Sequence, residues 1–164
     1  MLVGTYEHTI DGKNRLFVPS KFRAELGSEF IYKVFRSKYP SIQLYRKEDF
    51  ERELIESTKD ISNDQKKRRA MAEKCLGTGE AVCDNQGRIV LNMSLAKDAK
   101  IEKECILSGF GTYVEIMSRE VYDAFSESLT EEAVRQEESF ESEEKLRCDK
   151  RAEGAYLDLP DSEL

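Results

Sequence analysis

The chain has 164 residues, of which 39% are hydrophobic and 36% are charged, and its net charge is −7. No apolar run approaches the roughly 18 residues that a membrane span needs, and residues 1–5 (MLVGT) lack the features of a signal peptide, so we expect a cytoplasmic protein with no membrane partner. The net charge does not exclude nucleic acid, because residues 1–74 carry 16 basic against 12 acidic side chains, whereas residues 126–164 carry 5 against 13.

The first predicted element is a strand–turn–strand segment whose turn reads Asp-x-x-x-Arg at residues 11–15. Asp11 can accept hydrogen bonds from backbone N–H groups two or three residues further on. Asn14 tolerates positive φ, which predicts a left-handed kink that presents Arg15 in a fixed direction. Lys13 and Arg15 can then face an anion, or Arg15 can pair with Asp11 and brace the turn, and the two roles can coexist.

A short helix is predicted next, because Phe22 and Leu26 have the i,i+4 spacing of one helix face. Pro19 suits the first turn of this helix, and Gly27 would end it. Two strands and a closing helix are predicted after it, at residues 30–34, 42–45 and 47–55. The second strand alternates apolar and polar residues, which is typical of a half-buried strand.

Residues 55–76 are predicted as a linker helix that contains the run Lys66-Lys67-Arg68-Arg69. Four adjacent cations spread around a helix instead of forming one stripe, which favours a solvated linker. A supplementary contact to phosphate or to another subunit is the alternative.

A second copy of the unit follows at an offset of 73 residues. It aligns Asp11 with Asp84, Asn14 with Gly87, and Arg15 with Arg88. Glycine also tolerates positive φ, so both turns predict the same kink. Lys13 becomes Gln86 in the second copy. The first turn is therefore the more basic one, and we expect the main contact surface there.

The rest of the second copy predicts the same elements in the same order. Leu95 and Ala99 form the apolar helix pair, with Asn92 as its N-cap. A strand, a turn, a second strand and a helix are predicted at residues 105–107, 109–111, 114–117 and 118–125. One copy alone would leave a hydrophobic sheet face open, so we expect two copies to cover each other through a pseudo-two-fold axis.

The remaining segment, residues 126–164, is acidic and has few large apolar residues. It is predicted to be helical or disordered. A solubilising tail, a partner-binding segment and an acidic competitor for the basic turns are the alternatives for its role.

Residue types typical of catalytic and metal sites are scarce. The four cysteines form no closely spaced pair, and His8 is the only histidine. Neither a zinc site nor a nucleophile–base set is predicted, so we expect no metal and no cofactor, and an enzyme is the least favoured class.

The duplicated turn resembles that of the MraZ family, bacterial regulators built from two AbrB-like swapped-hairpin units with an Asp-x-x-x-Arg turn in each half. Residues 6–19, YEHTIDGKNRLFVP, follow the pattern of the family's first half. The resemblance extends from residue 1 to residue 125. Asn14 and Asn92 stand where the family usually has glycine and proline.

This resemblance implies a mainly β fold with short helices (α+β), in which duplicated AbrB-like swapped-hairpin units form a double-split β-barrel with a pseudo-two-fold axis. The corresponding organisation is a first repeat at 1–54, a linker helix at 55–76, a second repeat at 77–125 and an acidic tail at 126–164.

The resemblance also implies a nucleoid-associated repressor that binds direct repeats of double-stranded DNA upstream of the division and cell-wall gene cluster, including its own promoter. It implies self-assembly into a ring of about eight to twelve subunits. Carried over by position, the DNA-contacting residues are Lys13 and Arg15, with Arg88 as a weaker candidate. The turn-structuring residues are Asp11, Asn14, Asp84 and Gly87.

Two other classes compete with this reading. An antitoxin-like module would use the same hairpins for DNA and the acidic tail for a partner protein, although such antitoxins usually carry one unit per chain. A structural ring without nucleic-acid function is the other alternative.

Overall fold

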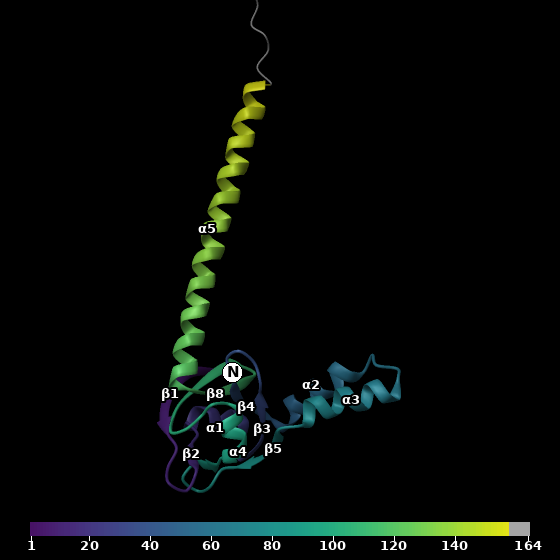
Figure 1. Ribbon diagram of the computed structural model, residues 1–164, viewed down its shortest axis with the longest axis vertical. Helices are drawn as coiled ribbons and strands as arrows, with labels where there is room; N and C mark the ends of the chain where they lie inside the picture. Colours follow the sequence, from purple (N-terminus) through teal and green to yellow (C-terminus); the bar gives the residue numbers. More distant parts are fainter. Residues whose placement is uncertain (158–164) are drawn as a thin grey trace, which may run out of the picture. The chain divides into compact units, whose positions relative to one another are not determined.

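The structure is a computed structural model that describes residues 1–157 (Figure 1). The chain divides into two compact units, Met1–Asp123 and Ala124–Leu164. Within residues 1–157, no helix combines the length and the apolar character that crossing a membrane requires.

The first unit consists of short strands and helices in the order that the repeat predicts. Its strands are β1 Leu2–Thr9, β2 Arg15–Phe17, β3 Glu29–Phe35, β4 Ser41–Arg46, β5 Thr78–Val82, β6 Arg88–Val90, β7 Glu104–Gly111 and β8 Tyr113–Ser118. The helices are α1 Ser20–Leu26, α2 Lys47–Thr58, α3 Asp64–Cys75, α4 Met93–Asp98 and the start of α5 Arg119–Leu157.

The strands form a six-stranded antiparallel sheet in the order β1-β7-β8-β4-β3-β5 and a separate two-stranded ribbon of β2 and β6. The first strand of each copy pairs inside the other copy, because β1 lies against β7 and β5 lies against β3. This exchange is the swapped-hairpin arrangement. The predicted fold class is confirmed, as mainly β layers with short helices built from two exchanged repeats.

The pseudo-two-fold axis passes between strands of equivalent sequence. In the sheet, Gln43 of β4 lies opposite its equivalent Glu115 of β8. In the ribbon, Leu16 lies opposite its equivalent Ile89. Each repeat therefore supplies half of both layers, which confirms that the two copies cover each other.

The hydrophobic core includes the inward faces of the sheet and the ribbon together with residues of α1 and α4. Its largest fully buried side chains include Phe22, Phe30, Leu16, Ile42, Leu44, Ile89, Ile101, Leu107 and Ile116. These residues come from both copies, so neither repeat has a complete core of its own.

The helix ends follow the capping signals of the sequence. Gly27 ends α1 with a φ of 84°, and the Asn92 side chain accepts from the backbone N–H of Ser94 at 3.0 Å. Pro19 stands one position earlier than predicted, since the helix begins at Ser20 and Pro19 is its N-cap.

Two local predictions need correction. The turn predicted at residues 109–111 is displaced toward the C-terminus, because the last pair between β7 and β8 joins Gly109 to Val114 and the chain reverses between them, with Gly111 at a φ of 91°. Strand β7 itself continues to Gly111, since it pairs with β1 along its whole length. Residues 42–45 and 114–117 are not half-buried, since all of them are buried at the centre of the sheet.

Helix α2 packs against the sheet from outside the barrel core, and its Phe50 ring lies 6.1 Å from that of Tyr45.

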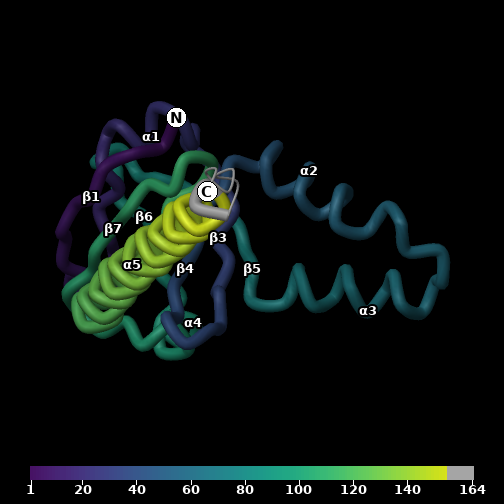
Figure 2. Tube along the Cα trace, turned by 90° about the horizontal axis from the view of Figure 1, so that it is seen from above, coloured from purple at the N-terminus to yellow at the C-terminus, as the bar shows by residue number. Residues whose placement is uncertain are grey.

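The segment between the copies is a helical hairpin. Helix α2 continues to Thr58, and α3 begins at Asp64 after the N-cap Asn63, whose side chain accepts from the backbone N–H of Lys66. Figures 1 and 2 show α2 and α3 running side by side next to strands β3 and β5.

Helix α5 runs from Arg119 to Leu157 without a break at residue 125, and Ser118 caps its start by accepting from the backbone N–H of Val121. The described part of the predicted acidic tail is therefore helical. Its last seven residues, 158–164, lie outside the described part of the chain.

Candidate nucleic-acid interface

The first turn is folded around the Asp11 carboxylate. One oxygen, Oδ1, accepts from the backbone N–H groups of Lys13 and Arg15, each at 2.9 Å. The other, Oδ2, accepts from Arg15 Nε at 2.6 Å. Asn14 has a φ of 59°, which confirms the predicted left-handed kink.

The second turn repeats this geometry almost atom for atom. Asp84 Oδ1 accepts from the backbone N–H groups of Gln86 and Arg88 at 2.8 and 2.9 Å, and Oδ2 accepts from Arg88 Nε at 3.0 Å. Gly87 has a φ of 77°, as the sequence predicts. The brace between aspartate and arginine is therefore present in both turns.

The two turns are also tied to each other across the axis. The backbone N–H of Val18 donates to the Gly87 carbonyl at 2.9 Å, and the N–H of Leu91 donates to the Asn14 carbonyl at 2.8 Å. Each positive-φ residue thus presents its carbonyl to the strand that leaves the other turn. Because the turns share these bonds, we expect the conformation of one to depend on the other.

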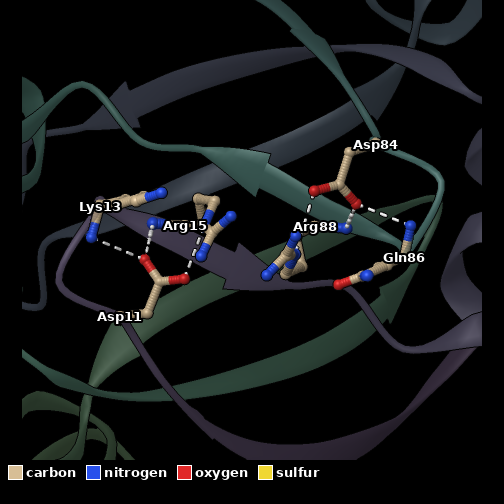
Figure 3. Close-up of polar contacts among 6 residues, drawn as sticks. All are labelled: Asp11, Lys13, Arg15, Asp84, Gln86 and Arg88. Carbon is tan, nitrogen blue, oxygen red and sulfur yellow. Dashed lines mark hydrogen bonds and ion pairs between the residues drawn. The ribbon is translucent and has the colours of Figure 1, made fainter.

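The ribbon between the turns has one inward and one outward face. Leu16 and Ile89 point inward and are fully buried. The alternation of strand side chains therefore directs Arg15 and Arg88 outward. Figure 3 shows the two arginines near the middle of the ribbon, with Lys13 and Gln86 at its opposite ends. The pseudo-two-fold axis brings together the site residues predicted from separate parts of the sequence.

The apolar residues of the outward face lie between these cations. Phe17 pairs with Arg88 across the ribbon, and Val90 pairs with Arg15. Val90 is 68% exposed although it is apolar. Val90 and the two arginines together form a surface that can contact both the charged and the apolar groups of a ligand.

The carboxylates of the turns stay ionised over a wide pH range. The pKa of Asp11 lies below its ordinary value, mainly because its carboxylate accepts from the backbone N–H of Arg15. The pKa of Asp84 is lowered in the same way by the backbone N–H of Arg88. Each arginine is paired with its own aspartate, so the net charge of the two pairs is near zero. Lys13 has no ion-pair partner among residues 1–157.

Sequence reasoning missed one residue of this surface, Arg23 of α1. Its Nε donates to the Val18 carbonyl at 2.8 Å, and its guanidinium lies 5.4 Å from the centre of the Phe17 ring. The Phe17 ring also contacts the His8 ring, at 5.0 Å between centroids. Nothing in the turn motif pointed to Arg23, because it belongs to a helix and reaches the second turn only through the fold.

Other predicted features lie apart from this surface. The run at residues 66–69 is exposed on α3, where Arg69 pairs with Glu73 at 3.2 Å. Within the described part of the chain, no three His, Cys, Asp or Glu side chains are grouped so that they could hold a metal ion.

Comparison with known proteins gives one consistent result. A family model described as "MraZ protein, putative antitoxin-like" matches residues 1–74 and again residues 75–144. Each match contains one of the two turns, so the match agrees with the duplication.

Curated relatives carry the same family name. "Transcriptional regulator MraZ" of Caldanaerobacter subterraneus subsp. tengcongensis is 39% identical over 129 residues, which cover 78% of this chain and 88% of the relative. The protein of the same name from Thermoanaerobacter pseudethanolicus is 39% identical over 127 residues, or 77% of this chain and 87% of the relative. In Mycoplasmopsis pulmonis the identity is 35% over 134 residues, or 81% and 89%.

The fold and the paired turns define the class of duplicated AbrB-like swapped-hairpin proteins. With both halves matched by the family model and relatives above one-third identity over most of their length, the chain belongs to the MraZ family.

Proposed function

We propose that this protein is a DNA-binding transcriptional regulator that places the outward face of the β2–β6 ribbon against double-stranded DNA. The observation that carries the proposal is the position of Arg15 and Arg88 on one face of a ribbon whose other face is locked into the core. A two-stranded ribbon fits the major groove, where arginine pairs with guanine O6 and N7. The relatives' name, transcriptional regulator, supports the same class.

The roles divide between contact and support. Lys13, Arg15 and Arg88 are the proposed DNA contacts. The residues that hold them are Asp11, Asn14, Asp84 and Gly87. Because each arginine keeps its Nε on an aspartate, its two terminal nitrogens remain to donate to DNA, in an orientation fixed before binding.

The finer proposal follows the family resemblance. The protein represses transcription from direct repeats upstream of the division and cell-wall gene cluster, including its own promoter, and is associated with the nucleoid. It acts as a ring-shaped homo-oligomer of about eight to twelve subunits, in which repeated turns meet repeated sites and raise the avidity.

A gel shift with a duplex from the DNA upstream of its own gene tests the contact surface. Arg15→Ala is expected to abolish the shift while the fold and native mass are kept, and wild-type affinity should fall steeply with salt. Lys21→Ala is the matched control, because Lys21 is an exposed cation of α1 outside the ribbon. Unchanged affinity of Arg15→Ala contradicts the assignment of Arg15.

Two further measurements test the finer proposal. Deleting one direct repeat from a reporter promoter should relieve repression, and native mass spectrometry should show a closed ring. A monomer that still represses contradicts the ring.

An antitoxin-like role is the second candidate, favoured by the description of the family and by the acidic helix α5. This role requires a partner protein that binds the full chain in fixed stoichiometry. The partner should no longer bind a shortened chain that ends at residue 125. Absence of such a partner contradicts this role and leaves the DNA-binding proposal in place.

A further inference from the structure

The two turns differ in the charge of their own residues. Arg15 and Arg88 are each paired with the aspartate of the same turn. The first turn adds Lys13, whereas the second turn has the neutral Gln86 at the equivalent position. Among its own residues, the second turn therefore has no cation that is free of an ion pair.

Arg23 lies directly against this second turn. If Gly87 carried a Cβ atom, that atom would be 2.6 Å from Cζ and 2.6 Å from Nε of Arg23. The guanidinium is therefore packed onto the residue at the apex of the turn, next to Gln86. Its hydrogen bond to the Val18 carbonyl and its contact with Phe17 fix its plane.

The charge of Arg23 is available for an external ligand. Among the residues that the structure describes, no carboxylate is within ion-pair distance of its guanidinium, and Nε is the only one of its nitrogens that donates a hydrogen bond. The side chain is half-buried. The two terminal nitrogens are thus held in a fixed plane without an acceptor.

The first turn has no equivalent arginine from the short helix of the other copy. The residue equivalent to Arg23 in the second copy is Ala96, which is fully buried. Lys13 and Arg23 are therefore unpaired cations from different sources, one at each turn. Lys13 comes from the loop of the first turn, whereas Arg23 reaches the second turn from α1 of the first copy.

We propose that Arg23 contacts a DNA phosphate at the second turn, where Arg23 and Arg88 form a composite anion site that replaces the charge absent at Gln86. The site is built from both repeats, so it exists only in the exchanged fold. This inference rests on the proposed DNA-binding function. Guanidinium groups suit phosphate oxygens, and a guanidinium held in place before binding loses little side-chain freedom.

The test measures fluorescence anisotropy with a labelled duplex from the DNA upstream of the gene, over a series of salt concentrations. Arg23→Ala should weaken binding on the order of tenfold, as expected for losing a hydrogen bond to a charged group. It should also reduce the slope of log affinity against log salt by about one, which corresponds to one phosphate. Lys13→Ala should have a similar effect, and Lys21→Ala should leave the slope unchanged.

A rescue separates charge from structure. Adding Gln86→Lys to Arg23→Ala should restore both affinity and slope, because the lysine returns a cation to the same turn. An Arg23→Ala variant with wild-type affinity and slope overturns the inference. A second result would also overturn it: Arg23→Ala loses affinity and has a lowered melting temperature, and Gln86→Lys does not restore the affinity. That combination would assign Arg23 a structural role.

Failure of the inference and failure of the proposed function are distinguishable. Salt-dependent wild-type binding that is lost in Arg15→Ala supports the function, whatever Arg23→Ala does. A wild-type protein that binds neither this duplex nor a random duplex contradicts both.

Discussion

Gln43 and Glu115, equivalent residues of the two repeats, face each other across the centre of the sheet. Gln43 Nε2 donates to Glu115 Oε1 at 2.9 Å, and Gln43 Oε1 accepts from the Tyr45 hydroxyl at 3.0 Å. A residue pair that lies on the pseudo-two-fold axis has thus diverged into an amide and an acid that satisfy each other.

Replacing Glu115 with glutamine should stabilise the fold more at neutral pH than in acid. Burial raises the pKa of Glu115, against a smaller lowering by the hydrogen bond from Gln43. An acid whose folded pKa is raised costs stability above that pKa and nothing below its unfolded pKa. Urea unfolding should show a gain on the order of 1 kcal/mol at about pH 7 that disappears at about pH 4. A gain that is equal at both values contradicts the prediction.

Asp11→Asn should destabilise the protein with the opposite pH dependence. The folded pKa of Asp11 is lowered, so its contribution is complete above the unfolded pKa and is lost as pH falls through the folded pKa. Melting temperatures of wild type and variant should therefore differ at neutral pH and converge in acid. Asp84→Asn should behave in the same way, and the exposed Asp60→Asn is the control that should show no difference at either pH.

Gly87→Asn should destabilise the fold although asparagine occupies the equivalent position 14. The added Cβ would meet the guanidinium of Arg23, which must give up its hydrogen bond to the Val18 carbonyl in order to move aside, at a cost of about 1 kcal/mol. Arg23→Ala in the same chain should recover most of this loss in a double-mutant cycle of unfolding free energies. Independent, additive effects of the two substitutions would falsify the contact between Arg23 and Gly87.

Gly109→Ala should loosen the edge of the sheet. A Cβ at Gly109 would lie 2.6 Å from the backbone carbonyl carbon and oxygen of Leu2, and backbone cannot move as a flexible side chain can. A loss of about 1–3 kcal/mol in unfolding free energy is expected. Gly12→Ala is the control, because nothing lies within 4 Å of its added Cβ. Hydrogen exchange should show the loss first in β1.

Local signals made the turns and helix ends predictable. Asp11 with Asn14, and Asp84 with Gly87, determine each turn within a few residues, and Asn92 and Gly27 determine a start and an end. The alignment of the copies also predicted the pseudo-two-fold axis, since a duplicated pattern must bury its sheet face somewhere.

The sequence did not predict the features that depend on contacts between residues far apart in the chain. The turn-forming glycines at 109–111 marked the reversal of the chain, but pairing with β1 extends β7 to Gly111, so the turn lies nearer to β8 than predicted. The polar residues Gln43 and Glu115 of β4 and β8 suggested an exposed face, but both are buried and hydrogen-bond to each other across the two strands. Arg23 gave no signal because its neighbour Gly87 is 64 residues away in the sequence, and only the exchange of strands joins them.

Because β1 and β5 are exchanged, cleavage of the chain between the repeats should not separate them. Residues 59–63, between α2 and α3, separate the two repeats in sequence, but every layer of the first unit contains strands from both sides of that point. A protease that cleaves there would leave two fragments that remain held by four ladders, β1 with β7, β3 with β5, β4 with β8, and β2 with β6. The halves should consequently melt in one transition, and neither fragment alone should retain a folded barrel.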